Sequence, residues 1–416
     1  MKVLIIGSGG REHAIAKKLQ QDIDQCDIYV LPGNGGISQQ FACPEIQAED
    51  ISSVINYVLT NNIDYVIPST EEPIVSGIID ALIGVGVCCF GPSKNAAIIE
   101  GSKWFSKEFM RRHAIPTAEY RLFDDYEMAK QYLQTCKYPK VIKADGLAKG
   151  KGVYIVRNVD QAIHALNSFM VDLQFGKAGE RVVIEEYLEG HEVSVQLFTD
   201  GHDFVCLPSS MDYKKIGEKN VGLNTGGMGA ISPNPFYSKD IEQICICNII
   251  KPTLRGLEQE GRKYVGCLYI GLMLTADGPK VLEYNCRLGD PETEAILPLI
   301  ESSVLEMMLW TNGKVPKPKI KLQNNVSCSV ILASKGYPQA FKTGISLTIP
   351  SDVLQNVCLC GVKFSPNGLI SASGRVLAVT TVAGTLLQAV EHCYAVIDKI
   401  NPTEFYYRRD IGKTFC

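Results

Sequence analysis

The segment "VLEYNCRLGDPE" (281–292) carries polar side chains at alternate positions of a strand-like run. Because residues two apart face the same side of a strand, we expect Glu283, Asn285 and Arg287 to project from one face. A carboxylate and an amide oxygen suit Mg²⁺, which binds a few protein oxygens together with substrate phosphates. An arginine beside them can hold a carboxylate or a phosphate through two N–H groups. A buried salt bridge is the alternative, but an asparagine in an apolar strand needs a polar partner, which favours a site.

The segment "KADGLAKGKG" (143–152) combines three lysines with three glycines. Glycines let backbone N–H groups approach phosphate oxygens closely, while lysines neutralise the charge. The segment does not match the pattern G-x-x-x-x-G-K-[ST], because Val153 follows its last glycine. This segment alone fits two interpretations: a loop that closes over phosphates, or a solvated hairpin turn.

The segment "VVIEEYLEGHEVSV" (182–195) predicts two strands joined by a short acidic connector. Where a backbone leaves a sheet, its free N–H and C=O groups can bond the edge of an adenine ring. A carboxylate beyond that point, such as Glu192, can accept hydrogen bonds from ribose hydroxyls. An acidic surface hairpin is the alternative.

Two further segments are rich in glycine. "GSGGRE" (7–12) follows a buried strand and opens a helix, but Glu12 stands where the dinucleotide pattern G-x-G-x-x-G requires glycine. An anion site at the start of the helix and a plain tight turn are both open. "GLNTGGMGAISP" (222–233) offers backbone N–H groups that could bind an anion, or it forms an irregular loop.

These segments must be positioned by three structural units. Residues 1–102 show strands alternating with helices, which predicts an open parallel α/β sheet. Residues 103–322 contain short strands with one helical segment around 159–171, then a helix near 241–260 and a strand pair, which predicts α+β structure. Residues 323–416 show short strands, glycine turns and a helix at 383–399, which predicts a small β-rich domain.

Composition narrows the functional classes. The formal net charge of −4 argues against a nucleic-acid partner, which would require a basic face. The fifteen cysteines include no pairs at zinc-binding spacing and indicate reduced thiols. No apolar run reaches the roughly 18 residues of a membrane span, and the chain opens on a strand rather than a signal peptide. We therefore expect a cytoplasmic protein with neither a membrane nor a nucleic-acid partner.

The order of the segments carries more information than any one of them. Their order resembles that of the ATP-grasp superfamily: a lysine, a glycine–lysine loop, an E-E-Y-L connector and an E-x-N-x-R strand. Members of that superfamily hold ATP between two α+β units and activate a carboxylate as an acyl phosphate. Seven motifs, in family order, resemble the phosphoribosylamine–glycine ligases: "GSGGREHA", "LPGNGG", "EGSKWFSKEFM", "KADGLAKGKGV", "NTGGMGA", "EYNCRLGDPE" and "FYYRRDIG".

The resemblance implies a fold and a reaction. Residues 1–102 would form a Rossmann-like substrate domain, and residues 103–322 an ATP-grasp domain with a mobile lid at about 120–192. The reaction would join glycine to phosphoribosylamine with ATP, through glycyl phosphate, and give glycinamide ribonucleotide, ADP and phosphate. Glycine, phosphoribosylamine and ATP would be the partners, with Mg²⁺ or Mn²⁺ as the metal, in a monomer or a homodimer.

Family roles pass to the matching positions of this chain. Arg287, Asp290 and Asp212 would be catalytic, and Glu283 and Asn285 would bind the metal. ATP would contact Lys103, Lys143, Lys149, Gly150, Glu185, Leu188 and Glu192, with adenine at Glu185 and Leu188 and ribose at Glu192. Glycine and the reacting phosphate would meet Asn224, Thr225, Gly226 and Gly227, and phosphoribosylamine would meet Gly10, Arg11, Glu12 and Glu71.

The chain departs from the family pattern at several positions. The usual S-Q-D-H-K-R is "SMDYKK" here, so Met211 and Tyr213 replace glutamine and histidine, and Leu223 stands where proline is common. Glu71 is kept in a changed turn, "STEEPIVSG". These changes bear on the shape of the glycine pocket. The alternatives are another ATP-grasp carboxylate–amine ligase or carboxylase, a dinucleotide-dependent oxidoreductase, and a nucleotide-binding protein without catalysis.

Overall fold

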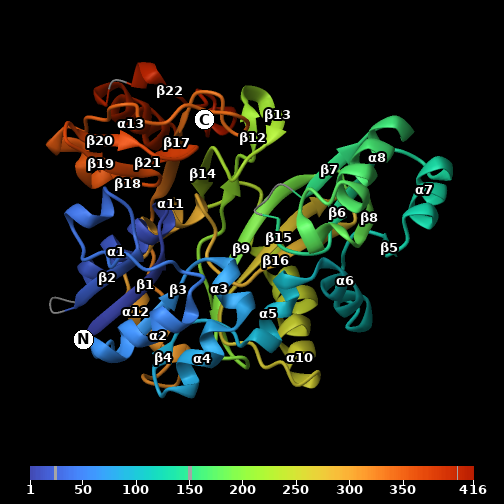
Figure 1. The fold of residues 1–416 in the computed structure, drawn as a ribbon, viewed down its shortest axis with the longest axis horizontal. Coiled ribbons are helices and arrows are strands. Elements are labelled where there is room, and N and C mark those ends of the chain that lie inside the picture. The colour runs from blue at the N-terminus through green and yellow to red at the C-terminus, as the bar shows by residue number, and fades with distance from the viewer. Residues whose placement is uncertain (23–25, 149–151, 401) are drawn as a thin grey trace.

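The computed structural model describes residues 1–22, 26–148, 152–400 and 402–416. Its sheets form three groups, each with helices packed around it (Figure 1). The expected ATP contacts Lys149 and Gly150 lie outside the described residues.

An open parallel sheet in the order β2-β1-β3-β4 forms the N-terminal part, as predicted. Its strands are β1 (Lys2–Gly7), β2 (Asp27–Pro32), β3 (Tyr65–Pro68) and β4 (Cys88–Cys89). Val3 and Ile5 pack in one apolar cluster, and Leu4 and Ile6 pack in another. Both faces of the sheet are therefore covered, which explains why β1 is an unbroken apolar run.

Helices from distant parts of the chain cover the two faces of this sheet. One face packs against α1 (Gly10–Asp22) and α12 (Val304–Thr311), and the other packs against α2 (Ile51–Thr60) and α4 (Ile78–Gly84). Helix α3 (Glu71–Ser76) contacts α5 (Lys94–Gly101), which leads into the next unit.

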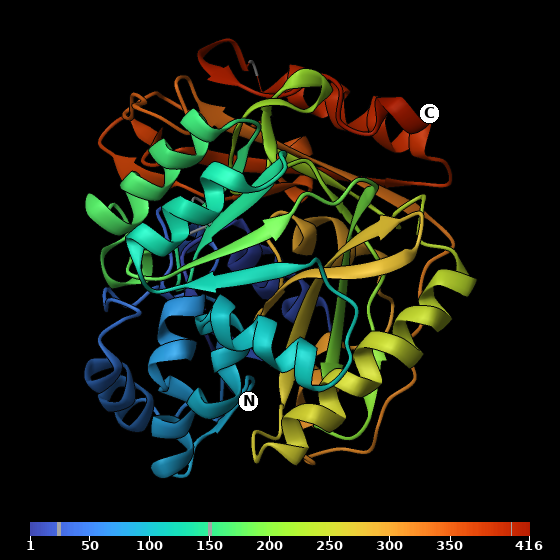
Figure 2. The same ribbon diagram turned by 90° about the vertical axis from the view of Figure 1, so that its right-hand side faces the viewer.

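Two antiparallel sheets form the central part, in the orders β5-β8-β6-β7 and β10-β9-β15-β16. The first contains β5 (Tyr120–Phe123), β6 (Lys140–Ala144), β7 (Val153–Val156) and β8 (Val182–Glu186), and the second contains β9 (His191–Thr199), β10 (Phe204–Cys206), β15 (Gly266–Thr275) and β16 (Gly278–Asn285). Figure 2 views the molecule from the side of these two sheets.

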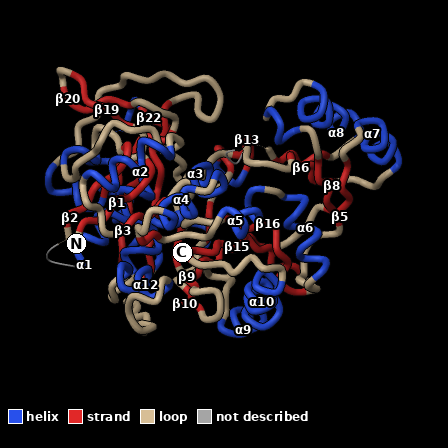
Figure 3. The backbone as a smooth tube through the Cα atoms, turned by 60° about the horizontal axis from the view of Figure 1, so that its bottom comes forward, coloured by secondary structure: helices blue, strands red, loops and turns tan. Residues whose placement is uncertain are grey.

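Each central sheet has its own helices and its own apolar cluster. The first packs against α7 (Tyr126–Thr135) and α8 (Val159–Leu166), which lie together in Figure 3. The second packs against α5, α6 (Lys103–Arg112), α9 (Lys239–Cys245) and α10 (Lys251–Gln259). The prediction of a single helical segment at 159–171 was wrong, because α7 also forms. Asp125 caps α7 by accepting from the Met128 N–H, and Ala129 and Leu133 are buried four residues apart.

A six-stranded antiparallel sheet forms the third part, in the order β11-β14-β17-β21-β18 with β22 on β17. Its members are β11 (Met211–Asp212), β14 (Gly229–Ser232), β17 (Val326–Ser334), β18 (Val357–Leu359), β21 (Arg375–Ala383) and β22 (Phe405–Tyr406). Helix α13 (Leu386–Lys399) packs on this sheet, and α11 (Glu292–Ile296) contacts β14 and β17. Two hairpins stand beside it, β12 (Lys215–Gly217) with β13 (Val221–Asn224), and β19 (Val362–Ser365) with β20 (Gly368–Ser371).

Within residues 1–22, 26–148, 152–400 and 402–416, no helix combines the length and the apolar character that a membrane crossing needs.

Candidate active site

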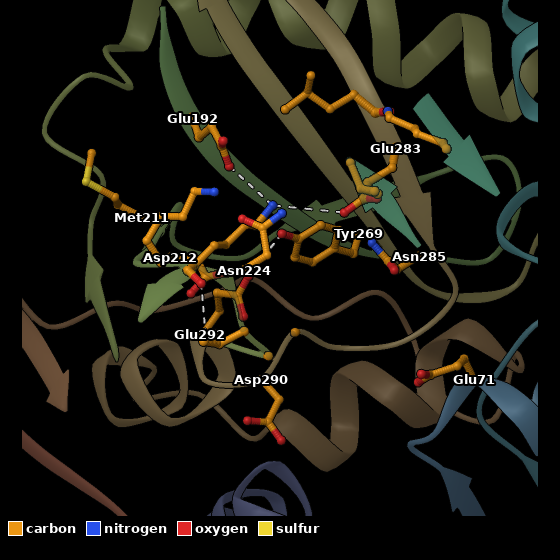
Figure 4. Close-up of a pocket in the computed structure, with 18 of the residues that line it drawn as sticks. Glu71, Glu192, Met211, Asp212, Asn224, Tyr269, Glu283, Asn285, Asp290 and Glu292 are labelled. Carbon is orange, nitrogen blue, oxygen red and sulfur yellow. Dashed lines mark hydrogen bonds and ion pairs between the residues drawn. The ribbon is translucent and has the colours of Figure 1, made fainter. Parts of the chain in front are cut away.

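A cavity of about 840 Å³ is lined by both central sheets, by the β12–β13 segment, and by the starts of α1 and α3 in the N-terminal part. A smaller cavity of about 130 Å³ adjoins it and shares Lys143, Glu185 and Glu283 with it. Figure 4 shows side chains from these separate segments lining one space. The segments singled out in the sequence are therefore brought to one place in the fold.

The end of β16 carries the predicted metal ligands. Glu283 and Asn285 both line the two cavities, as expected for residues on one strand face. Burial by itself would raise the pKa of Glu283, but Lys214, Lys143 and Lys103 outweigh burial and lower it. Glu283 is therefore held as a carboxylate. A carboxylate and an amide oxygen that open on a space beside lysines fit a divalent cation completed by phosphates and water.

Arg287 links this strand end to the N-terminal part of the chain. Its Nε donates to Glu71 Oε2 at 3.1 Å, and its Nη2 lies 3.7 Å from Glu100 Oε1. Burial raises the pKa of Glu100 to about 7 despite Arg287, whereas Arg287 and Arg11 outweigh burial at Glu71 and lower its pKa to about 2. The guanidinium therefore has acidic partners from α3 and α5 while it lines the cavity.

A buried group of three charges lies where the phosphates are expected. Glu185 is 3.0 Å from Lys143 Nζ and 3.2 Å from Lys107 Nζ, and all three side chains are less than a tenth exposed. Lys143 Nζ also donates to Leu282 O at 3.0 Å. The sequence analysis missed Lys107, although it lies four residues after Lys103 in a helix and therefore on the same face. Lys103 Nζ donates to Gly146 O at 3.0 Å.

An apolar end of the large cavity adjoins the connector between β8 and β9. Leu188 and Glu192 line it, as expected for the adenine and ribose contacts. Glu185 also lines it, although its carboxylate is paired with the two lysines. The sequence analysis missed the strand residues that make this end apolar: Val141, Val153, Ile155, Met273 and Leu282. Their alternation along β6 and β7 was the available signal.

A second charged group lies on β11, β15 and the start of α11. Asp212 is half-buried, and desolvation of its carboxyl group together with the charge of Glu292 raises its pKa well above the ordinary value. Glu292 Oε1 accepts hydrogen bonds from Tyr269 at 3.0 Å and from Ser194 at 3.1 Å. These last three residues were not predicted from the sequence. Lys214 lies 3.2 Å from Glu192 and 4.0 Å from Glu283, as the dashed lines in Figure 4 mark.

The glycine-rich loop after β13 borders the same cavity. Asn224, Thr225 and Gly226 line it. Thr225 N donates to Lys214 O at 2.8 Å, and Gly227 N donates to Thr225 Oγ1 at 3.0 Å. Gly227 has a φ of +110° and is buried behind the lining, where an added Cβ would come within 2.8 Å of Asp212 Oδ1. Glycine is therefore required there for both conformation and space.

The turn before α1 forms the far end of the cavity. Arg11 and Glu12 line it, but they are paired with each other at 2.7 Å, and Arg11 Nη1 donates to Leu288 O at 3.1 Å. Gly10 does not line the cavity: it is buried, and an added Cβ would lie 2.7 Å from Cys360 Sγ.

Asp290 joins this end of the cavity to the C-terminal domain. Its carboxylate pairs with Arg375 of β21 at 2.9 Å, and Figure 4 shows it pointing away from Glu283. Arg375 Nη1 also donates to Gly226 O at 2.7 Å, so one side chain joins Asp290 to the glycine-rich loop. The sequence analysis did not single out Arg375.

Two antiparallel sheets that share a cavity lined by lysines and a buried carboxylate define the ATP-grasp class of proteins. The biotin carboxylase domain of a Hydrogenobacter thermophilus 2-oxoglutarate carboxylase has this fold, at 14% identity and a TM-score of 0.73 over 98% of this chain and 90% of that one. The chain belongs to the phosphoribosylglycinamide synthetase family, whose N, ATP-grasp (A) and C domain models match residues 1–100, 101–293 and 327–414.

Relatives match along the whole length of the chain. A phosphoribosylamine–glycine ligase of Caldanaerobacter subterraneus is 44% identical over 99% of each chain. The crystal structure of a Thermotoga maritima phosphoribosylamine–glycine ligase is 32% identical, with a TM-score of 0.86 over 99% of this chain and 100% of that one. A bifunctional purine biosynthetic protein of Pichia angusta is 43% identical over 99% of this chain, which spans 53% of that protein's length.

Proposed function

We propose that the protein is an ATP-dependent carbon–nitrogen ligase of purine biosynthesis that joins glycine to 5-phosphoribosylamine. The products are glycinamide ribonucleotide, ADP and phosphate. The observation that carries the proposal is the convergence of Lys143, Glu283 and Asn224 on one cavity, in a chain that belongs to this family from end to end. Its small-molecule substrates are ATP, glycine and phosphoribosylamine.

The chemistry proceeds in two steps. A glycine carboxylate oxygen attacks the γ-phosphorus of ATP, the bond to the β-phosphate oxygen breaks, and glycyl phosphate and ADP form. The amine of phosphoribosylamine then attacks the carbonyl carbon, phosphate leaves with the C–O bonding electrons, and the nitrogen loses a proton to give the amide. Phosphoryl transfer of this kind depends on positioning and on charge neutralisation rather than on a covalent intermediate with the protein.

The side chains of this chain supply that neutralisation. We assign Lys103 and Lys143 to the phosphates of ATP, because both line the smaller cavity beside Glu283. Lys143 is buried and lines the large cavity as well, and Lys103 is half-buried. We assign Leu188 and the apolar strand residues to adenine and Glu192 to ribose. Glu185 orients Lys143 and Lys107 through its two ion pairs, and it lines the large cavity.

The acceptor side of the cavity lies opposite. We assign Arg287, Asp290 and Asp212 to the reacting groups, and Asn224, Thr225, Gly226 and Gly227 to glycine and the transferred phosphate. Arg11, Glu12 and Glu71 would receive phosphoribosylamine, with Gly10 shaping the turn behind them. Met211 lines the cavity and Tyr213 lies behind it, so Met211 is the departure from the family pattern that reaches the cavity directly.

A divalent metal, Mg²⁺ or Mn²⁺, fits the oxygen donors of Glu283 and Asn285. When bound, it neutralises phosphate charge and orients the triphosphate. We infer that ATP phosphates and water complete the coordination of this metal, because Mg²⁺ binds a few protein oxygens together with substrate phosphates.

We propose three functional domains, residues 1–102, 103–322 and 323–416, with residues 120–192 as a lid. The lid assignment rests on the separate apolar cluster of the β5-β8-β6-β7 sheet. Acyl phosphates hydrolyse, so closure must exclude water during transfer. We further propose a cytoplasmic location, because all fifteen cysteines are free thiols. We propose a monomer or a homodimer as the oligomeric state.

The test is ADP release by the purified protein with ATP and Mg²⁺, with and without glycine and phosphoribosylamine, the latter generated in the assay because it is unstable. Full turnover is expected only when both are present. Release that responds to bicarbonate and ignores glycine would instead identify a carboxylase. Binding of ATP without release under any of these conditions would identify a non-catalytic nucleotide-binding protein.

A further inference from the structure

The motif "FYYRRDIG" (405–412) lies near the C-terminal end of the chain, shortly before the cavity-lining Phe415, and it contains the largest fully buried polar side chain. Arg408 is 1% exposed. Its Nε and Nη2 donate to the two carboxylate oxygens of Asp410, each at 2.8 Å. Its guanidinium also lies 5.0 Å from the centre of the Tyr213 ring. A buried guanidinium must be paired and hydrogen-bonded to offset its desolvation, and Arg408 meets both conditions.

The remaining donors of Arg408 reach the β12–β13 hairpin. Nη1 donates to Lys215 O at 3.0 Å and to Asn220 Oδ1 at 2.9 Å. Asp410 Oδ2 in turn accepts from Lys219 N at 2.8 Å. The pair therefore holds both the base and the tip of the hairpin.

Two neighbours add to this attachment. The Tyr406 hydroxyl donates to Ile216 O at 2.7 Å, and Arg409 N donates to Glu218 Oε1 at 3.2 Å. Figure 1 shows the hairpin beside the C-terminal end of the chain.

The hairpin cannot hold its conformation through its own packing. None of residues 215–224 is buried, and Val221 and Leu223 are 60% and 50% exposed. An isolated two-stranded hairpin is only marginally stable in water. Lys219 and Asn220 at its tip also have φ values of +56° and +55°. Asparagine tolerates this left-handed region, but the conformation is unfavourable for lysine. Contacts from outside must therefore fix its shape.

The hairpin faces the cavity on its other side. Lys215, Asn220 and Asn224 line the cavity, and the flanking Lys214 and Thr225 line it as well. Among the residues that the structure describes, those lining the two cavities do not include Arg408. Phe415, in the same C-terminal segment, does line the cavity. The side-chain hydrogen bonds of Arg408, however, reach Asp410 and the hairpin, so its influence on Asn224 and Thr225 passes through the hairpin.

We propose that Arg408, paired with Asp410, is a positioning residue for the acceptor side of the active site: it holds the 215–224 hairpin so that Asn224 and Thr225 meet glycine and the transferred phosphate. This inference rests on the proposed ligase function for the identity of the substrate. The attachment of the hairpin is independent of that function. The adenine end of the cavity, on β6, β7 and the β8–β9 connector, does not depend on Arg408.

The test combines hydrogen exchange with kinetics on Arg408→Met, with Arg409→Met as the matched control, because Arg409 is an exposed neighbour of equal charge. Without substrates, Arg408→Met is expected to speed exchange of the backbone amides of 215–224 and leave those of β6 and β8 unchanged. In turnover, a hairpin displaced by about 1 Å lowers kcat/KM for glycine by up to about 10²-fold, mainly through KM, while ADP affinity is kept. Arg408→Lys is expected to recover part of this loss.

Other outcomes would overturn the proposal. Unchanged exchange in 215–224 would show that Arg408 does not hold the hairpin. A fall in kcat with an unchanged KM for glycine, matched by an equal fall in the folded fraction measured by circular dichroism, would show only a loss of folded enzyme. If Arg408→Met does not fold, Tyr406→Phe removes the single bond to Ile216 O and is expected to cause the same changes at smaller size. Failure of the wild-type protein to release ADP with glycine would refute the proposed ligase function, while the exchange result would still decide the attachment.

Discussion

Replacing Arg287 with methionine removes the positive charge that joins the end of β16 to the N-terminal part of the chain. Arg287 lies 3.1 Å from Glu71 and 3.7 Å from Glu100. At an effective dielectric constant of about 20, each contact amounts to roughly 5 kcal/mol of gross attraction. Desolvation consumes part of this, so removing one partner of such a buried group is expected to destabilise the fold by about 3–5 kcal/mol at pH 8.

The pKa values of Glu71 and Glu100 determine whether the destabilisation by Arg287→Met grows or falls with pH. The pKa of Glu100 is raised to about 7 by burial, so its favourable contribution is present at low pH and disappears as the pH rises through about 7. The pKa of Glu71 is lowered to about 2, so its contribution is present above about pH 4.5 and is lost only as the pH falls toward 2. At pH 5.5 Glu100 is already protonated in the wild-type protein, and its pairing with Arg287 contributes little. We therefore expect the destabilisation of Arg287→Met to fall by about half between pH 8 and pH 5.5.

The assay is urea unfolding followed by far-UV circular dichroism at pH 5.5 and pH 8 for the wild-type protein, Arg287→Met and Arg287→Met/Glu100→Gln. The double variant is expected to regain stability at pH 8, because it no longer buries an unpaired carboxylate there. Arg111→Met is the control, since that arginine is exposed on the surface of α6 and should change nothing measurable. A loss for Arg287→Met of equal size at both pH values would refute the reasoning, because the loss would then come from packing and not from charge.

Further variants address the remaining charges. Glu283→Gln should fold normally yet lower glycine-dependent ADP release by about 10²–10³-fold, and wild-type release would remove the metal assignment. Glu185→Gln leaves two buried ammonium groups without their carboxylate and should lower the free energy of unfolding by about 3–5 kcal/mol. Lys107→Met should lower it by less than half of that amount, because Glu185 remains paired with Lys143. Equal losses for the two variants in thermal and urea unfolding would contradict this expectation. Lys149→Gly should raise the KM for ATP if the 146–152 loop covers the triphosphate, and an unchanged KM would make the loop a solvated turn.

Local patterns were sufficient for much of the molecule. The apolar run of β1 predicted a strand in a covered parallel sheet, because a strand that buries both faces has no polar alternation. The two-residue period of β16 predicted that Glu283 and Asn285 share a face, and the structure places both on the cavity. Helix α7 was not predicted, although Asp125 is a helix-capping residue, because only Ala129 and Leu133 of this helix are buried and its apolar period is correspondingly weak.

The partners of these residues could not be predicted from local patterns. Three ion pairs join positions that are far apart in the sequence: Lys107 and Glu185 are 78 residues apart, Arg287 and Glu71 are 216 apart, and Arg375 and Asp290 are 85 apart. Whether a given lysine faces solvent or a buried carboxylate depends on which helix packs on which sheet. The spacing of apolar and polar residues along the chain carries no information about this packing. Residue type and spacing therefore determined which side chains this protein has for chemistry, and tertiary packing alone decided which of them meet, because burial of a charge is tolerated only where the fold brings its counter-charge to within hydrogen-bonding distance.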